Sequence, residues 1–179
     1  MNRLYLAAPL LLVACNSQPT IKAENASVAE VAAQARSAVK IEPGQWSHQT
    51  DVLNFDMPGV KDPNMARIMG DAMKKAQSKT ISYCITPEEA AKPRFGETPG
   101  ADCRYKNFTM GGGKIDATMV CKPKQGGAMR MAMAGTYSPT AYDMTVEMKM
   151  DNPNMPGGGM TMKAHTKGAR TGECPAGAS

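Results

Sequence analysis

Alternation of apolar and polar residues in the C-terminal half of the chain constrains the fold more than any other feature. In the stretch "AMRMAMAGTYSPTAYDMTVEMKM" at 128–150, every second residue of each half is apolar, and most of these residues are methionine. Successive side chains of a β-strand point to opposite faces of the sheet, so a period of two indicates a half-buried strand. The pattern predicts antiparallel strands with one buried and one solvated face.

Further segments with this alternation precede and follow the methionine-rich stretch. The predicted strands include "TISYCIT", "DCRYKNFTM", "KIDATMVCK" and "MTMKAHTKGAR", and a Trp-containing strand begins at "PGQW". Turn-forming residues separate most of them, as in "GGG", "PKQGG", "SPT" and "DNPNMPGGG". Because short connections favour pairing of consecutive strands, we predict an α+β fold built on a curved antiparallel meander of about six or seven strands.

The segment "KDPNMARIMGDAMKKAQSK" at 61–79 changes to a helical period. Asp62 can cap a helix that has Pro63 at its first position. Apolar residues then recur at helical spacing, at Met65, Ile68, Met69, Ala72, Met73 and Ala76. We predict one amphipathic helix packed on the apolar face of the sheet, so that helix and sheet share one methionine-rich core.

The N-terminal sequence "MNRLYLAAPLLLVACNSQ" has the features of a bacterial export signal. Arg3 precedes an apolar run that is too short to span a bilayer. Leu-Val-Ala-Cys at 12–15 resembles the lipobox of bacterial lipoproteins, which implies that residues 1–14 are removed and that Cys15 carries acyl chains such as palmitate. The alternative is an ordinary secretory signal. We expect a membrane-anchored envelope protein that faces the periplasm, and Asn16 favours the outer membrane over the inner membrane.

Composition divides the mature chain into a linker and one domain. Residues 15–40 are small and polar, and their only periodicity is the helical spacing of Val28, Val31, Ala35 and Val39. We predict a lipidated tether that can contain a short helix. Residues 41–179 are long enough for a single β-rich domain with one core.

An exported protein keeps its disulfides, and four cysteines remain after Cys15: Cys84, Cys103, Cys121 and Cys174. Four cysteines allow three pairings. If the glycines at 111–113 form a hairpin loop, Cys103 lies opposite Cys121, which leaves Cys84 to pair with Cys174. The alternative is a zinc site, but these cysteines lack the close pairs that structural zinc sites use.

The methionines of the paired strands allow three interpretations: a Cu(I) site, an adaptable surface for a ligand or partner, and core packing. The "SPT" turn should bring Met131 near Met148 and Met129 near Met150, and thioether sulfur is a ligand for Cu(I) in an oxidising compartment. Neither His48 nor His165 lies on these methionine strand faces. We favour core packing, in which the methionines pack against the helix.

Charge and motifs limit the classes of function. The chain has 21 Lys+Arg and 16 Asp+Glu, and the basic residues are scattered, so we expect no nucleic-acid partner. HExxH, GxSxG and phosphate-loop motifs are absent from the sequence. We predict a non-enzymatic binding or interaction module without a cofactor, whose partner is a protein or a small apolar ligand. The alternatives are a Cu(I)- or lipid-binding carrier that uses the methionine face, and a hydrolase.

Each of these functions requires a different surface. A carrier needs a cavity between helix and sheet, an interaction module needs a closed core with an exposed apolar patch, and an enzyme needs a polar cleft with convergent titratable groups.

Several separated motifs resemble one known family. They are "PGQW", "MPG", "YCITPEEA", "GGGKIDATMVC", "GTYSPTAYDMTVEM" and the terminal "GEC", in this order and together with the four cysteines. They are similar to the small proteobacterial envelope lipoproteins grouped as domain-of-unknown-function family 3617, over most of residues 41–174. The resemblance implies a secreted or lipid-anchored protein with a compact β-rich domain, and it implies no catalytic residues. Glu173 before Cys174 departs from the Gly-Pro-Cys-like end of many members.

Overall fold

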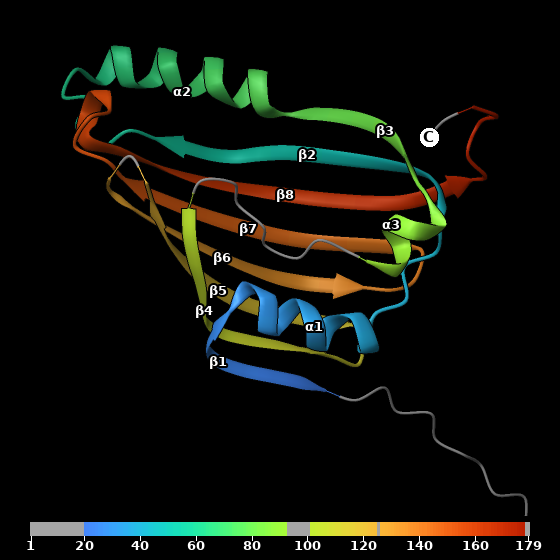
Figure 1. Ribbon diagram of the computed structural model, residues 1–179. Coiled ribbons are helices and arrows are strands. Elements are labelled where there is room, and N and C mark those ends of the chain that lie inside the picture. Colours follow the sequence, from blue (N-terminus) through green and yellow to red (C-terminus); the bar gives the residue numbers. More distant parts are fainter. Residues whose placement is uncertain (1–19, 93–100, 125, 178–179) are drawn as a thin grey trace, which may run out of the picture.

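The computed structural model describes residues 20–92, 101–124 and 126–177. These residues form one antiparallel sheet of eight strands in the order β1-β4-β5-β6-β7-β8-β2-β3, together with three α-helices and a short 3-10 helix (Figure 1). The predicted antiparallel sheet is confirmed. The predicted count of six or seven strands is wrong, because a further strand, β1, lies in the segment that was expected to be a tether.

The strands are β1 (Ile21–Ser27), β2 (Gly44–Asp56), β3 (Lys79–Ile85), β4 (Ala101–Gly111), β5 (Lys114–Pro123), β6 (Ala128–Tyr137), β7 (Ala141–Asp151) and β8 (Gly159–Gly172). The helices are α1 (Val28–Ala38), α2 (Pro63–Gln77), α3 (Pro87–Ala91) and the 3-10 helix η1 (Pro156–Gly158). From β4 to β8 the strands pair in chain order, which is the predicted meander. β2 then pairs with β8, β3 pairs with β2, and β1 pairs with β4 at the opposite edge.

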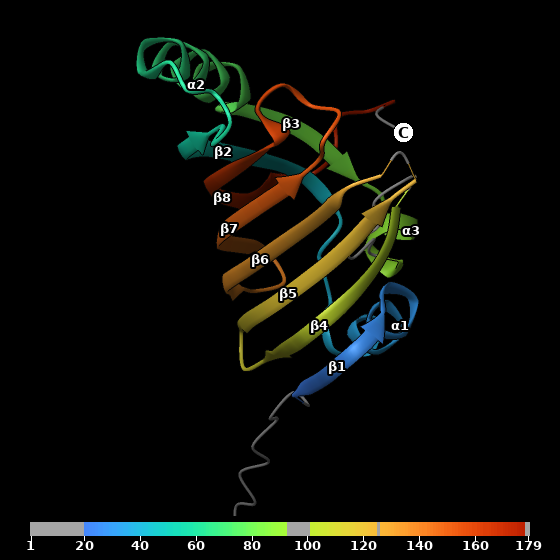
Figure 2. The same cartoon turned by 90° about the vertical axis from the view of Figure 1, so that its left-hand side faces the viewer.

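The sheet bends strongly around the side on which α1 and α3 lie (Figures 1 and 2). Twist accumulates from strand to strand, and a β-bulge adds local bending. Irregularities of this kind interrupt β2 between Gln45 and Trp46 and between Val52 and Asn54, and one interrupts β4 between Tyr105 and Asn107. The sheet is therefore an incomplete barrel with an inner and an outer face.

Both predicted disulfides are formed. Cys103–Cys121 joins β4 to β5, and Cys84–Cys174 joins β3 to the segment after β8. The turn between β4 and β5 is shorter than the predicted loop at 111–113, since Gly111 belongs to β4 and lies opposite Lys114. The bulge on β4 compensates for this difference and brings Cys103 opposite Cys121.

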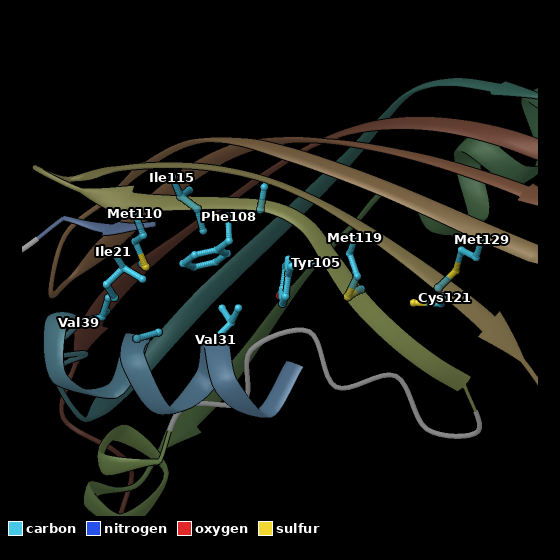
Figure 3. Close-up of a cluster of buried hydrophobic side chains, with 12 residues drawn as sticks. Ile21, Val31, Val39, Tyr105, Phe108, Met110, Ile115, Met119, Cys121 and Met129 are labelled. Atoms are coloured by element: carbon cyan, nitrogen blue, oxygen red, sulfur yellow. The ribbon is translucent and has the colours of Figure 1, made fainter. Parts of the chain in front are cut away.

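Helix α1 lies in the segment that was predicted to be a tether, so the structure differs from that prediction over residues 21–38. A capping box starts the helix: the backbone N–H of Glu30 donates to Ser27 Oγ (3.2 Å), and the backbone N–H of Ser27 donates to Glu30 Oε2 (2.7 Å). Val31 and Ala35 are completely buried. Val31 points from α1 towards Tyr105 and Phe108 of β4 (Figure 3). The small side chains of α1 allow the helix to lie close to the sheet. In the sequence, the same small residues resemble the composition of a linker.

Helix α2 forms as predicted but lies elsewhere. Asp62 Oδ1 accepts hydrogen bonds from the backbone N–H groups of Asn64 (2.8 Å) and Met65 (3.2 Å) at its start. The helix runs along the edge of the sheet beside β2 (Figure 1). Met65 and Ile68 are 55% and 60% exposed, so the prediction that this helix packs on the apolar face is wrong. β3 pairs with β2 only as far as Thr50, and α2 lies beside the remainder of β2.

Candidate ligand-binding cavity

An apolar cavity of about 300 Å³ lies on the inner face of the incomplete barrel. Its volume is at the lower end of the range of about 300–1,000 Å³ that is typical of small-molecule sites. Much of its wall is aromatic, from Trp46, Tyr83, Tyr105, Phe108, Tyr137 and Tyr142. Among the described residues that line it, none is charged. The site suits a largely apolar molecule.

The cavity exists because the sheet curls. Tyr83 of β3 and Tyr105 of β4 both line it, although β5, β6, β7, β8 and β2 lie between these strands in the sheet. In a flat sheet, six strand spacings of about 4.8 Å would separate the two strands by roughly 29 Å. Curvature therefore brings residues from distant strands around one volume.

The segment between α1 and β2 covers the end of the cavity next to the β6–β7 turn. The backbone N–H of Glu42 donates to the carbonyl of Pro139 in this turn (2.9 Å), and Trp46 Nε1 donates to the carbonyl of Glu42 (3.0 Å). Val39 and Ile41 of the same segment line the cavity. These hydrogen bonds hold two apolar side chains against the cavity.

A polar cluster stands beside Trp46 in the cavity wall. His48 on β2 is hydrogen-bonded through Nδ1 to the hydroxyl of Tyr142, and its Nε2 lies 2.9 Å from the hydroxyl of Thr50. The ring of Tyr142 stacks on Trp46, with ring centroids 6.3 Å apart. This arrangement suits a neutral imidazole that accepts from Tyr142 and donates to Thr50.

Burial keeps the cluster uncharged. It lowers the pKa of His48, and the nearby charge of Lys79 lowers this pKa further. Burial also raises the pKa of Tyr142 far above its usual range, and the neighbouring Tyr83 adds to the rise. At neutral pH the imidazole is therefore deprotonated and the phenol is protonated.

Tyr137 presents a buried hydroxyl to the same region. Its Oη has no hydrogen-bond partner among the residues that the structure describes, and burial raises the pKa of the phenol. Tyr137 lies opposite Tyr142 in the β6–β7 register. A buried hydroxyl without a partner costs about 1–3 kcal/mol, so a bound ligand that accepts this hydrogen bond would gain affinity. The sequence indicated neither Tyr137 nor His48 as a site residue, because their alignment depends on the pairing of β2 with β8, which places His48 opposite Gly168 and Gly168 opposite Tyr142.

Methionines continue the inner face away from the aromatic cavity. Met131 lies opposite Met148, and Met129 lies opposite Met150, as predicted. Met110, Met119 and Met129 are buried in the core that includes α1. The other methionines of β6, β7 and β8 are half-buried, and we call them the methionine face: Met131, Met133, Met144, Met148, Met150, Met160 and Met162. Only part of the predicted methionine core is therefore closed, and Met65 of α2 does not join it.

The candidate Cu(I) ligands are arranged as two cross-strand pairs. Met129 with Met150 and Met131 with Met148 are adjacent pairs on β6 and β7. Both histidines have other partners, since His48 contacts Tyr142 and His165 contacts Asp143. Within the described ranges, no three His, Cys, Asp or Glu side chains are grouped as a metal site would require.

The outer face carries exposed ion pairs between β7 and β8. Lys163 Nζ lies 2.8 Å from Glu147 Oε1, and His165 Nε2 lies 2.7 Å from Asp143 Oδ1. This is the predicted solvated face. In the described part of the chain, no hydroxyl or thiol is hydrogen-bonded to His165.

The predicted anchor residue Cys15 and the predicted signal at 1–14 lie outside the described residues. No helix in the described part of the chain has the length and apolar character needed to span a membrane.

Comparison with known proteins places the fold in a family. No curated protein and no solved structure matches the chain significantly. A family model described as "Protein of unknown function (DUF3617)" matches residues 41–174, which is more than half of the chain and includes every strand from β2 to β8. The strand β1 and the helix α1 lie outside the matched range. The chain therefore belongs to the DUF3617 family.

Proposed function

We propose that this protein is a lipid-anchored envelope protein whose folded domain binds an apolar small molecule inside the incomplete barrel. The observation that carries the proposal is the cavity of about 300 Å³ with its aromatic wall. A carrier requires such a cavity, whereas a pure interaction module requires a closed inner face.

The chemistry of the wall supports an apolar ligand. Each Å² of apolar ligand surface removed from water contributes about 25 cal/mol. The uncharged lining offers no compensation to a buried ionic group. Thioether side chains such as Met133 and Met144 at the margin are flexible, so they can adapt to ligands of different shape.

The proposed anchor suits this function. If Cys15 is lipidated, only residues 16–20 separate it from β1, and a chain of that length spans at most about 18 Å. The barrel would then stay near the bilayer surface, from which an apolar molecule can enter or to which it can return. Localisation in the periplasm, at the outer membrane, is part of the proposal.

Native mass spectrometry tests the proposed function. A full chain carrying Cys15→Ser, which lacks only the site of acylation, is purified from the periplasm without detergent. We expect the purified protein to carry a bound molecule, which appears as additional mass and is removed by organic extraction. We also expect Met133→Trp, which fills the cavity, to remove this mass, while Met65→Trp on exposed α2 retains it. A parent protein without bound mass would contradict binding in the cavity. Equal bound mass in the two variants would contradict it as well.

A Cu(I) carrier is the second candidate, favoured by the cross-strand pairs Met129–Met150 and Met131–Met148. An anaerobic Cu(I) titration against a competing chelator tests it. Tight binding that disappears when these four methionines are replaced by Leu would establish a copper site. Absence of binding in a folded protein would exclude one.

A further inference from the structure

We propose that the ligand is an uncharged single-chain molecule with one carbonyl oxygen, such as a long-chain ester, and that this oxygen accepts a hydrogen bond from Tyr137. The proposal rests on the proposed function, because it names the ligand class of the same cavity. It is carried by the position of one buried hydroxyl in an apolar wall.

Tyr137 is the donor that lacks a partner. Its Oη is buried, its side chain lines the cavity, and no described residue accepts its hydrogen bond. Buried hydroxyl groups in native proteins are nearly always paired. Two other hydroxyl groups of the wall are engaged: that of Tyr142 is bonded to His48, and Ser138 Oγ donates to the carbonyl of Ala141 (3.3 Å). Because this Oη is closed to solvent, a ligand oxygen completes the pairing when neighbouring side chains of the wall move aside.

The surroundings of Tyr137 select a neutral oxygen. The described lining includes no Lys, Arg or other cation that could neutralise a carboxylate. His48 is held neutral by burial, as its lowered pKa indicates. A buried carboxylate without a counter-ion would lose its hydration without compensation. A carbonyl oxygen accepts the same hydrogen bond without this loss.

The inner face of the sheet indicates where the rest of the ligand would lie. Tyr137 and Tyr142 stand where β6 turns into β7, and Met133 and Met144 follow them in the cavity wall. The methionine face continues along the strands to Met150. From Tyr142 to Met150 the strand extends about 27 Å, whereas the hydrocarbon of one bilayer leaflet is about 15 Å thick. The strand is therefore long enough for a single acyl chain to lie beside it.

Displacement of a fluorophore tests the ligand class. The full chain carrying Cys15→Ser is loaded with N-phenylnaphthylamine, an uncharged apolar fluorophore, and titrated with methyl palmitate, palmitate or hexadecane delivered from cyclodextrin. We expect the ester to bind roughly fivefold more tightly than the alkane, as one neutral hydrogen bond allows. We expect palmitate to bind more weakly than its ester.

The variant Tyr137→Phe removes only the hydroxyl. Its affinity for methyl palmitate should fall to that for hexadecane, and its affinity for hexadecane should not change. Thr145→Val, which removes a hydroxyl from the outer face of β7, should keep the preference for the ester. Infrared spectroscopy gives an independent result, because the ester carbonyl band should shift to lower frequency in the parent and not in Tyr137→Phe.

Three results would overturn the inference: equal affinity for ester and alkane in the parent, a preference that survives in Tyr137→Phe, or tighter binding of palmitate than of its ester. Failure of the proposed function would look different, because none of the three compounds would displace the fluorophore, and this result would remove the inference as well.

Discussion

Tyr137 and Tyr142 are register partners on β6 and β7, but their hydroxyl groups are in different situations: that of Tyr142 is bonded to His48, and that of Tyr137 has no partner in the described part of the chain. Both side chains line one apolar cavity. The difference leaves one buried hydroxyl of the described cavity wall without a hydrogen-bond partner. Such a group fixes the orientation of a ligand, whereas the apolar wall supplies most of its affinity.

The disulfide Cys84–Cys174 should support ligand binding. It holds β3, whose residues Tyr83 and Ile85 belong to the cavity wall. Replacing both cysteines by Ala should lower the free energy of unfolding by about 2–4 kcal/mol and weaken fluorophore binding. The variant lacking Cys103–Cys121 should lose stability but keep more of its binding. Urea unfolding and fluorescence titration measure the two effects, and stronger loss of binding in the second variant would contradict this account.

Helix α1 should be essential for stability, although its sequence looks like a linker. Val31 is completely buried, whereas Ala33 on the same helix is exposed. Val31→Asp would bury an unpaired charge and should lower the melting temperature severely or prevent folding. Ala33→Asp is the matched control and should have little effect. Equal melting temperatures for the two variants would show that α1 is only a tether.

Stability should depend on the protonation of His48. Burial lowers the pKa of this histidine in the folded state, so the unfolded chain binds a proton more readily. The associated stability is complete above the unfolded pKa of about 6.5 and is lost as the pH falls through the lower folded pKa. His48→Asn should reduce the acid-side slope of unfolding free energy against pH. An unchanged slope in His48→Asn would contradict the assignment.

Membrane attachment should depend on Cys15. Changing it to Ser removes the thiol to which the acyl chains attach, so the protein should move from the membrane fraction to the soluble periplasm. Fractionation of cells measures this change, and mass spectrometry of the N-terminal peptide of the parent should show the acyl chains. A parent protein that is already soluble would refute the anchor.

Local features of the fold could be predicted from the sequence. The alternation around Met131 and Met148 identified β6 and β7 and the face that each side chain occupies, because this pattern depends only on strand geometry. Asp62 and Pro63 identified the start of α2 for a similarly local reason. The partner Cys121 for Cys103 was also correct, although an unpredicted bulge compensates for a shifted turn.

Long-range features could not be predicted. Alternation assigns faces but contains no information on curvature, so the meeting of Tyr83 and Tyr105 around one cavity was not apparent. The apolar stripe of α2 indicated that one face of the helix packs against another element. It did not indicate which element. Val31 and Ala35 gave a weak signal because small side chains bury little area each, yet they allow the close approach of α1. The alignment of His48, Tyr137 and Tyr142 depends on the pairing of β2 with β8, two strands that are far apart in the sequence.

Saturation binding of N-phenylnaphthylamine to the Cys15→Ser chain and to its Met133→Trp and Met65→Trp derivatives tests the central claim most directly. The account predicts saturable binding at one site, lost when Met133→Trp fills the cavity and kept when Met65→Trp alters only exposed α2. Saturable binding that is unaffected by Met133→Trp but lost in Met65→Trp would place the ligand on α2 and contradict the account.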